Sequence, residues 1–161
     1  MPQEIERKFL VVGDGWRADV VRSERLCDGL VAASDGRKVR VRLYEGRATL
    51  TVKSRQRRGC RAEFEYEIPL DEAHEMLAAH CHPGTIEKTR HHVPFGGFHW
   101  EVDVYEGLLA GIVLAEVELD RIDREVPIPD WAGEEVTGRP EYKKRAMLAA
   151  RRNGSKAGPA R

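Results

Sequence analysis

Six short segments of the chain alternate apolar and charged residues with a period of two. Residues two apart in an extended strand point to the same face, so each segment predicts a β-strand with one apolar and one ionic face. The segments are EIERKFLVV (4–12), KVRVRL (38–43), LTVKS (50–54), RAEFEYEI (61–68), WEVDVY (100–105) and LAEVEL (114–119).

The ionic face of each segment carries mainly one sign of charge. A single strand of this kind is typical of the solvated face of an antiparallel sheet. The whole set is harder to explain in that way, because like charges directly opposite one another are unfavourable. Rows of carboxylates attract divalent cations, and rows of Arg and Lys attract anions. A phosphate chain with bound metal would satisfy both.

The motif Glu4-x-Glu6-x-Lys8 resembles the hallmark of the CYTH, or triphosphate tunnel metalloenzyme, superfamily. Further matches follow in family order as far as about Leu148, so the resemblance covers nearly the whole chain. They are Arg40 and Arg42, Lys53, Glu65 and Glu67, Lys88 and Arg90, Glu101 and Asp103, Glu116 and Glu118, and Lys143. One departure is Leu30, which stands where many members have a tyrosine hydroxyl.

The remaining pattern predicts a few helices around a mainly antiparallel set of about eight strands. Helical periodicity covers 71–82 and 140–152, and Gly96-Gly97 predicts a hairpin turn. We therefore expect an α+β fold: an eight-stranded antiparallel closed β-barrel with an ionic bore, an apolar outer wall and helices packed outside. Closure of the barrel is implied by the resemblance. The domain is expected over 1–151, with a disordered tail over 152–161.

The composition limits the range of possible partners and functions. The 161 residues contain 27 Lys and Arg and 27 Asp and Glu, so the formal net charge is zero. A nonspecific nucleic-acid or membrane binder would show a basic excess, so neither partner is expected. The three cysteines are widely spaced, and no long apolar run or signal segment is present. We expect a cytoplasmic protein; a homodimer is compatible with this interpretation.

The acidic rows suit hard cations, because oxygen ligands favour Mg²⁺ or Mn²⁺ over Zn²⁺. The resemblance implies that two such ions are held by these rows, with Glu101 as a neighbour of the ligands proper; a static lattice of ion pairs is the alternative. The metal set is Glu4, Glu6, Glu101, Asp103, Glu116 and Glu118. An ion near Glu4 would polarise the attacking water.

The basic rows suit phosphate, since Arg forks bind its oxygens in pairs and Lys supplies a movable charge. The substrate-binding set implied by the resemblance is Lys8, Arg40, Arg42, Lys53, Lys88, Arg90 and Lys143. Lys88 is expected on the leaving-group side as a proton donor, and Lys8 and Glu4 complete the catalytic set. Glu63, Glu65 and Glu67 are expected to support the basic residues.

These sets predict divalent-metal-dependent hydrolysis of a triphosphate, with inorganic tripolyphosphate as the expected substrate. Two other enzyme classes, a class IV-type adenylyl cyclase and a thiamine triphosphatase, would need a base or thiazole pocket. A polyphosphate- or nucleotide-binding module without catalysis is the alternative of another class; it would keep the bases and lose the acids. The histidines at 80, 82, 91 and 92 favour a structural or solvated role over a zinc site.

Overall fold

One antiparallel sheet forms most of the molecule. The computed structural model describes residues 2–82 and 84–154, and ten of its segments join the sheet in the order β1-β6-β5-β4-β3-β7-β8-β9-β2-β10. The strands are β1 Gln3–Glu4, β2 Glu6–Val11, β3 Arg22–Ser34, β4 Arg37–Leu43, β5 Ala48–Lys53, β6 Arg61–Ile68, β7 Thr85–Phe95, β8 Phe98–Tyr105, β9 Val113–Glu118 and β10 Ala132–Glu135. The α+β class and the antiparallel pairing are as predicted.

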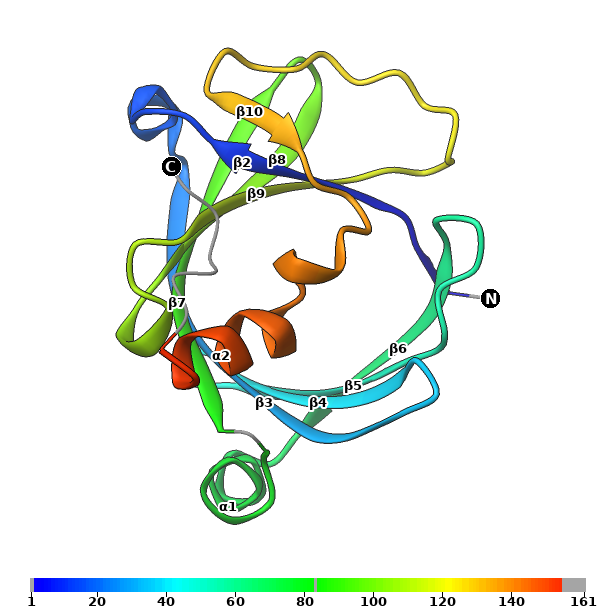
Figure 1. Cartoon of the computed structure of the whole chain (residues 1–161), viewed down its shortest axis with the longest axis vertical. Coiled ribbons are helices and arrows are strands. Elements are labelled where there is room, and N and C mark those ends of the chain that lie inside the picture. Colours follow the sequence, from blue (N-terminus) through cyan, green and yellow to red (C-terminus); the bar gives the residue numbers. More distant parts are fainter. Residues whose placement is uncertain (1, 83, 155–161) are drawn as a thin grey trace.

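The prediction of a closed barrel of eight strands is wrong. The ladder has ten strands, and its two ends, β1 and β10, are not paired with each other. The expected first strand is divided at Ile5, so that Glu4 pairs with Arg61 of β6 whereas Glu6 pairs with Glu118 of β9. The strands β1 and β2 are consecutive in the chain, yet β1 pairs with β6 and β2 pairs with β9. The chain therefore brings these two parts of the sheet together, and the sheet curls into a ring (Figure 1).

The outer wall of the ring is apolar, as the alternation predicts. Phe9, Trp100, Val102 and Val117 belong to one buried cluster, and Trp131 covers it with its ring 5.4 Å from that of Trp100. Burying a large apolar side chain contributes roughly 1.5–3 kcal/mol to stability. The outer wall is therefore the main hydrophobic core, and the charged faces of the same strands face the interior of the ring.

Helix α1, Leu70–Ala79, packs outside the ring as expected, against β3 and β4. Its buried Ala73 forms a cluster with Val41 and Ala48 of the sheet. Gly29 allows this approach, because a Cβ atom at that position would collide with Leu77 and Cys81.

The C-terminal helix is not outside the ring, which corrects the expectation that all helices pack there. The predicted helix over 140–152 is divided into the 3₁₀ turn Pro140–Tyr142 and α2, Lys144–Arg152. In Figure 1, α2 lies across the opening of the ring. Its Met147 and Leu148 pack against Ile86 and Leu114, whose positions face inward. One end of the interior is thus apolar and covered by α2.

Two further 3₁₀ turns, Gly15–Asp19 and Gly107–Leu109, complete the regular structure of the described residues. Most of the tail that we expected to be disordered lies outside the described residues, and Arg152 still belongs to α2. Within the described part of the chain, no helix has the length and apolar character needed to cross a membrane.

Candidate active site

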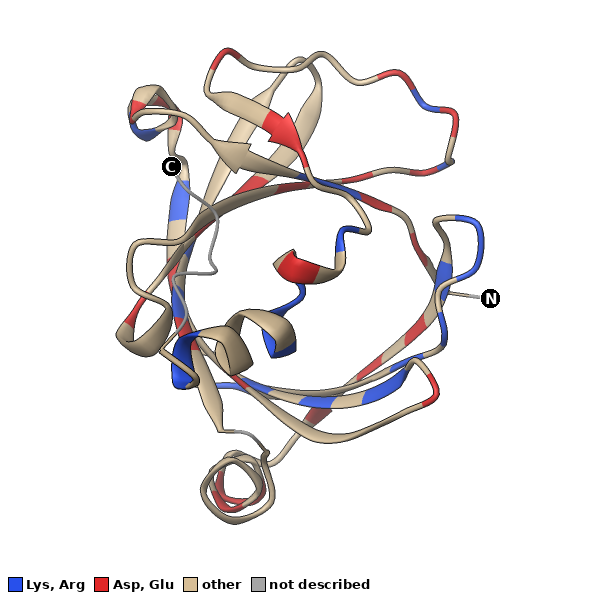
Figure 2. Cartoon of the chain, in the orientation of Figure 1, with Lys and Arg blue, Asp and Glu red and all other residues tan. Residues whose placement is uncertain are grey.

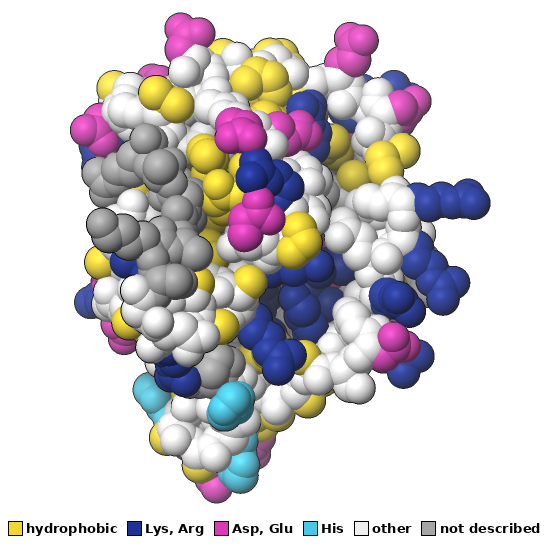
Figure 3. Space-filling view, in the orientation of Figure 1, with side chains coloured by type: hydrophobic (Ala, Val, Ile, Leu, Met, Phe, Trp, Pro, Cys, Tyr) yellow, Lys and Arg dark blue, Asp and Glu magenta, His cyan; other side chains and the backbone are white. Residues whose placement is uncertain are grey.

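A cavity of about 850 Å³ lies inside the ring, beside α2. Charged positions recur along the strands that surround it (Figure 2), and Lys and Arg side chains gather in the hollow seen in Figure 3. Among the described residues that line the cavity, thirteen are Lys or Arg and eight are Asp or Glu. Positive charge is therefore in excess, and a polyanion with several negative charges would match it.

Most of the residues predicted for the site meet in this cavity. The predicted residues that line it are Glu4, Glu6, Lys8, Arg40, Arg42, Lys53, Glu63, Glu65, Arg90, Glu101, Glu116, Glu118 and Lys143. Lys88, Asp103 and Glu67 are not among the lining residues. The first two are buried on the inward faces of β7 and β8, and Glu67 is exposed. The roles assigned to all of them stay predictions.

Carboxylates face each other across the strands β2, β9 and β8. Glu6 lies opposite Glu118, and Glu101 lies opposite Glu116 in the next ladder. Burial raises the pKa of Glu6 to about 7, and the charges of Glu116 and Glu4 add to the effect. Burial and neighbouring carboxylates also raise the pKa of Glu118. Lys8, Arg61 and Arg90 offset part of this negative charge, and a bound cation would offset more of it.

Glu4 is held by cations. Its carboxylate accepts hydrogen bonds from Lys53 Nζ at 2.7 Å and from Arg61 Nε. Burial raises the pKa of Glu4. The charges of Lys53 and Arg61 outweigh this effect and lower the pKa to about 2. Lys53 also contacts Glu63 at 3.0 Å. Glu4 is thus ionised at neutral pH and fixed between two strands.

The basic side of the cavity includes one buried hydrogen-bond donor, Arg40 Nε, that has no acceptor among the described residues. Arg40 contacts Thr51 and Glu65, but its buried Nε atom has no hydrogen-bond partner among the described residues. Lys8 Nζ lies 3.3 Å from Glu116. Buried donors without acceptors are costly, so an anion in the cavity would stabilise this arrangement.

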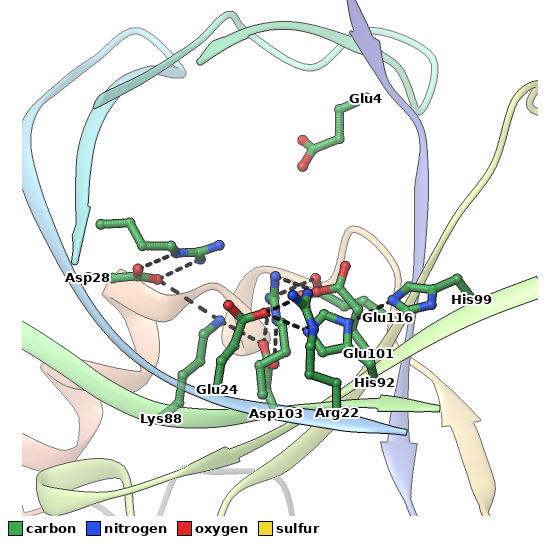
Figure 4. A network of polar contacts seen from close by, with 12 residues as sticks. Glu4, Arg22, Glu24, Asp28, Lys88, His92, His99, Glu101, Asp103 and Glu116 are labelled. Carbon is green, nitrogen blue, oxygen red and sulfur yellow. Dashed lines mark hydrogen bonds and ion pairs between the residues drawn. The ribbon is translucent and has the colours of Figure 1, made fainter. Parts of the chain in front are cut away.

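Lys88 and Asp103 form the most buried ion pair below the cavity. Lys88 Nζ donates to Asp103 Oδ2 at 2.6 Å, and Arg90 Nε donates to the other oxygen at 2.8 Å. Burial lowers the pKa of Lys88, with Asp103 acting in the opposite direction. Figure 4 shows this pair beside Asp28 and apart from Glu4. Lys88 is therefore held in a buried ion pair next to Asp28, which lines the cavity.

Among the described residues, eight charged cavity residues were not in the predicted set: Asp28, Lys38, Arg55, Arg58, Arg61, Arg139, Lys144 and Arg145. Arg61 stands on the ionic face of the RAEFEYEI segment, and Lys144 follows Lys143, so both had a signal in the sequence. Asp28 is two residues before Leu30 and shares its strand face. Lys38 is two residues before Arg40 on the same face.

The histidines of β7 and β8 do not form a metal centre. His92 Nε2 contacts Glu24 at 2.6 Å, and His92 Nδ1 contacts His99 at 2.7 Å (Figure 4). Both ring nitrogens of His92 are therefore occupied. Across residues 2–82 and 84–154, no group of three or more His, Cys, Asp or Glu is arranged to hold a metal ion. The acids of the cavity are instead paired with Lys and Arg.

Comparison with known proteins identifies the family. The family model described as the CYTH domain matches residues 2–150. The chain belongs to the CYTH family. A relative from Acetivibrio thermocellus named inorganic triphosphatase is 41% identical over 142 residues, covering 88% of this chain and 90% of the relative. A second protein of that name, from Nitrosomonas europaea, is 36% identical over 153 residues and covers 89% and 95%.

Solved structures share the architecture. The crystal structure of an inorganic triphosphatase is 34% identical, with a TM-score of 0.63 and coverage of 92% of this chain and 95% of that chain. A protein from Pyrococcus furiosus is 22% identical with a TM-score of 0.59, which shows likeness of fold alone. The family assigned from the eight ordered motifs is confirmed.

Proposed function

We propose that this CYTH protein hydrolyses inorganic tripolyphosphate to pyrophosphate and phosphate with a divalent cation. The observation that carries the proposal is the cavity itself, which is lined by thirteen basic and eight acidic side chains among the described residues, and nine of the strands contribute to them. The name inorganic triphosphatase, which two relatives over 35% identical bear, supports the same reaction.

In this reaction, a water oxygen bonds to a terminal phosphorus while the bridging bond to pyrophosphate breaks and a proton is released. Such transfer depends on in-line positioning and charge stabilisation more than on covalent chemistry. Arg40 and Arg42 lie on one strand and line the cavity. The planar guanidinium of Arg40 matches phosphate oxygens, whereas Arg42 already donates two hydrogen bonds to Asp28. Arg40 Nε, which has no acceptor in residues 2–82 and 84–154, gives such an oxygen a donor without breaking a hydrogen bond seen there.

The acidic row fits a divalent cation. Its donors are all oxygens, and the opposed pairs Glu6–Glu118 and Glu101–Glu116 place like charges side by side. Burial raises the pKa of Glu6 most, and the charges of Glu116 and Glu4 raise it further. We infer that these four residues and Glu4 would hold Mg²⁺ or Mn²⁺. A bound cation would screen charge on the phosphate oxygens and polarise the attacking water.

The competing functions lack support in the cavity lining. A cyclase or a thiamine triphosphatase needs a surface on which a base or ring stacks, yet Tyr44 is the one aromatic residue among the described lining residues. Arg47 already lies 3.7 Å from the centre of the Tyr44 ring. A module that only binds polyphosphate would not need the acidic row.

The deciding experiment measures phosphate release by the full chain from tripolyphosphate, ATP, thiamine triphosphate and pyrophosphate, each with EDTA, Mg²⁺ or Mn²⁺. We expect tripolyphosphate to react fastest, and only with metal. Cyclic AMP as the main product from ATP would favour the cyclase. Tight binding of tripolyphosphate without turnover in any metal would favour the binding module.

A further inference from the structure

Lys38 is a basic residue of the cavity that the family motifs do not include. It is the second residue of β4 and shares the inward face with Arg40 and Arg42. In the adjacent ladder it lies directly opposite Lys53. Two like charges at opposed positions destabilise a sheet unless something neutralises them.

The neighbours of Lys38 are neutralised, but Lys38 is not. Lys53 pairs with Glu4 and Glu63, Lys8 pairs with Glu116, and Arg61 pairs with Glu4. No ion pair joins Lys38 to a carboxylate of residues 2–82 or 84–154. The charged groups with the largest effect on it are four cations: Arg61, Lys143, Lys53 and Lys8.

This environment is unfavourable for the ammonium group in the empty cavity. Burial, and then these four cations, lower the pKa of Lys38 to about 8. An ammonium group that is partly buried among cations gains most from an anion, and phosphate is the anion for which the cavity is built. The nearby Arg40 Nε, two residues along the same strand, also lacks an acceptor among the described residues.

We propose that Lys38 binds one phosphoryl group of a linear polyphosphate beside Lys143 of the family motifs, and so adds a subsite to the basic rows. The subsite lies near the start of β4, beside the Ser54–Cys60 segment, whose Arg55 and Arg58 also line the cavity. This deepens the proposed function, since it assumes that a polyphosphate enters the cavity.

The test compares Lys38→Met with Arg37→Met in the full chain. Arg37 is the preceding residue, is exposed and does not line the cavity, so its variant removes one positive charge at nearly the same place. We expect Lys38→Met to raise KM for tripolyphosphate roughly tenfold, as for loss of one charge-assisted hydrogen bond, with kcat little changed. Arg37→Met should change KM by less than about twofold, and Lys38→Arg should restore most of the affinity.

Two further measurements separate this proposal from the proposed function. Calorimetric binding of tripolyphosphate with Ca²⁺ should weaken in Lys38→Met even if no variant hydrolyses it, so a failed triphosphatase assay leaves the subsite testable. The unliganded Lys38→Met protein should melt at a higher temperature than the wild type, because repulsion is removed. Wild-type KM and wild-type affinity in Lys38→Met would overturn the subsite, as would a lower melting temperature of that variant.

Discussion

Lys144 Nζ lies 3.1 Å from Asp28 Oδ2, which joins the first residue of α2 to the interior face of β3. The same carboxylate accepts hydrogen bonds from Arg42 Nε at 2.6 Å and from Arg42 Nη2 at 2.9 Å. Asp28 is only 4% exposed. One buried carboxylate therefore connects the C-terminal helix to two strands of the ring.

Replacing this carboxylate should strongly destabilise the fold. Burial raises the pKa of Asp28, but Arg42 and Lys144 lower it well below its usual value, so the side chain is charged at neutral pH. Asp28→Asn leaves buried cations without their counter-ion, and we expect a loss of about 3–5 kcal/mol in the free energy of unfolding. Urea denaturation at pH 7 measures it. Asp123→Asn, which breaks the exposed pair with Arg121, is the control and should cost less than about 1 kcal/mol.

Much of the site could be predicted because strand periodicity places alternate residues on one face without knowledge of the pairing. Glu4, Arg40 and Glu116 come from distant segments, yet each lies on the charged face of its strand and lines the cavity. The apolar outer wall followed from the same alternation.

The features that were missed depend on tertiary contacts. Nothing in the spacing shows that Gln3–Glu4 and Glu6–Val11 pair with different strands. The closed barrel was expected from the family resemblance, which does not show where the first strand divides. The amphipathic pattern of α2 shows that one face is buried but not against what, so its packing against Leu114 inside the ring was not foreseen. Lys144 could be assigned to Asp28 only once that helix was placed.

The acidic row should govern the response to metal. Glu118 lies opposite Glu6, and burial and surrounding carboxylates raise its pKa, so a cation should relieve local repulsion. We expect Glu118→Gln to require roughly tenfold more Mn²⁺ for half-maximal activity, as for loss of one charged contact. Glu67→Gln, at an exposed position outside the cavity, is the control. An unchanged Mn²⁺ titration in Glu118→Gln would remove this residue from the metal set.

Glu4 should make stability depend on acid pH. Its pKa is about 2 in the folded state against 4.5 for the ordinary group, so its ionised form stabilises the fold above pH 4.5. That contribution, on the order of 3 kcal/mol, declines as the pH falls from about 4.5 towards 2. In EDTA, the wild type should therefore be more stable than Glu4→Gln at about pH 5, and this difference in unfolding free energy should shrink as the pH is lowered to about 3. A difference that stays constant over this range would show that Lys53 and Arg61 do not hold the charged form.

Ligand binding should stabilise the folded protein in a way that depends on phosphate chain length. A ligand that binds only the folded state adds about 2.7 kcal/mol at a hundredfold excess over its dissociation constant, which corresponds to a rise of roughly 5–10 °C in the melting temperature of a chain of this size. We expect tripolyphosphate with Ca²⁺ to produce such a rise, and orthophosphate at equal ionic strength to produce much less, because one phosphate cannot reach both ends of the basic rows.

Arg40→Ala should reduce the rise, since it removes the buried Nε donor that lacks an acceptor among the described residues. Arg47→Ala is the matched control, because Arg47 is exposed and does not line the cavity. Equal rises with tripolyphosphate and orthophosphate would contradict convergence of the rows on one anion, since separate solvated charges would bind either ligand alike.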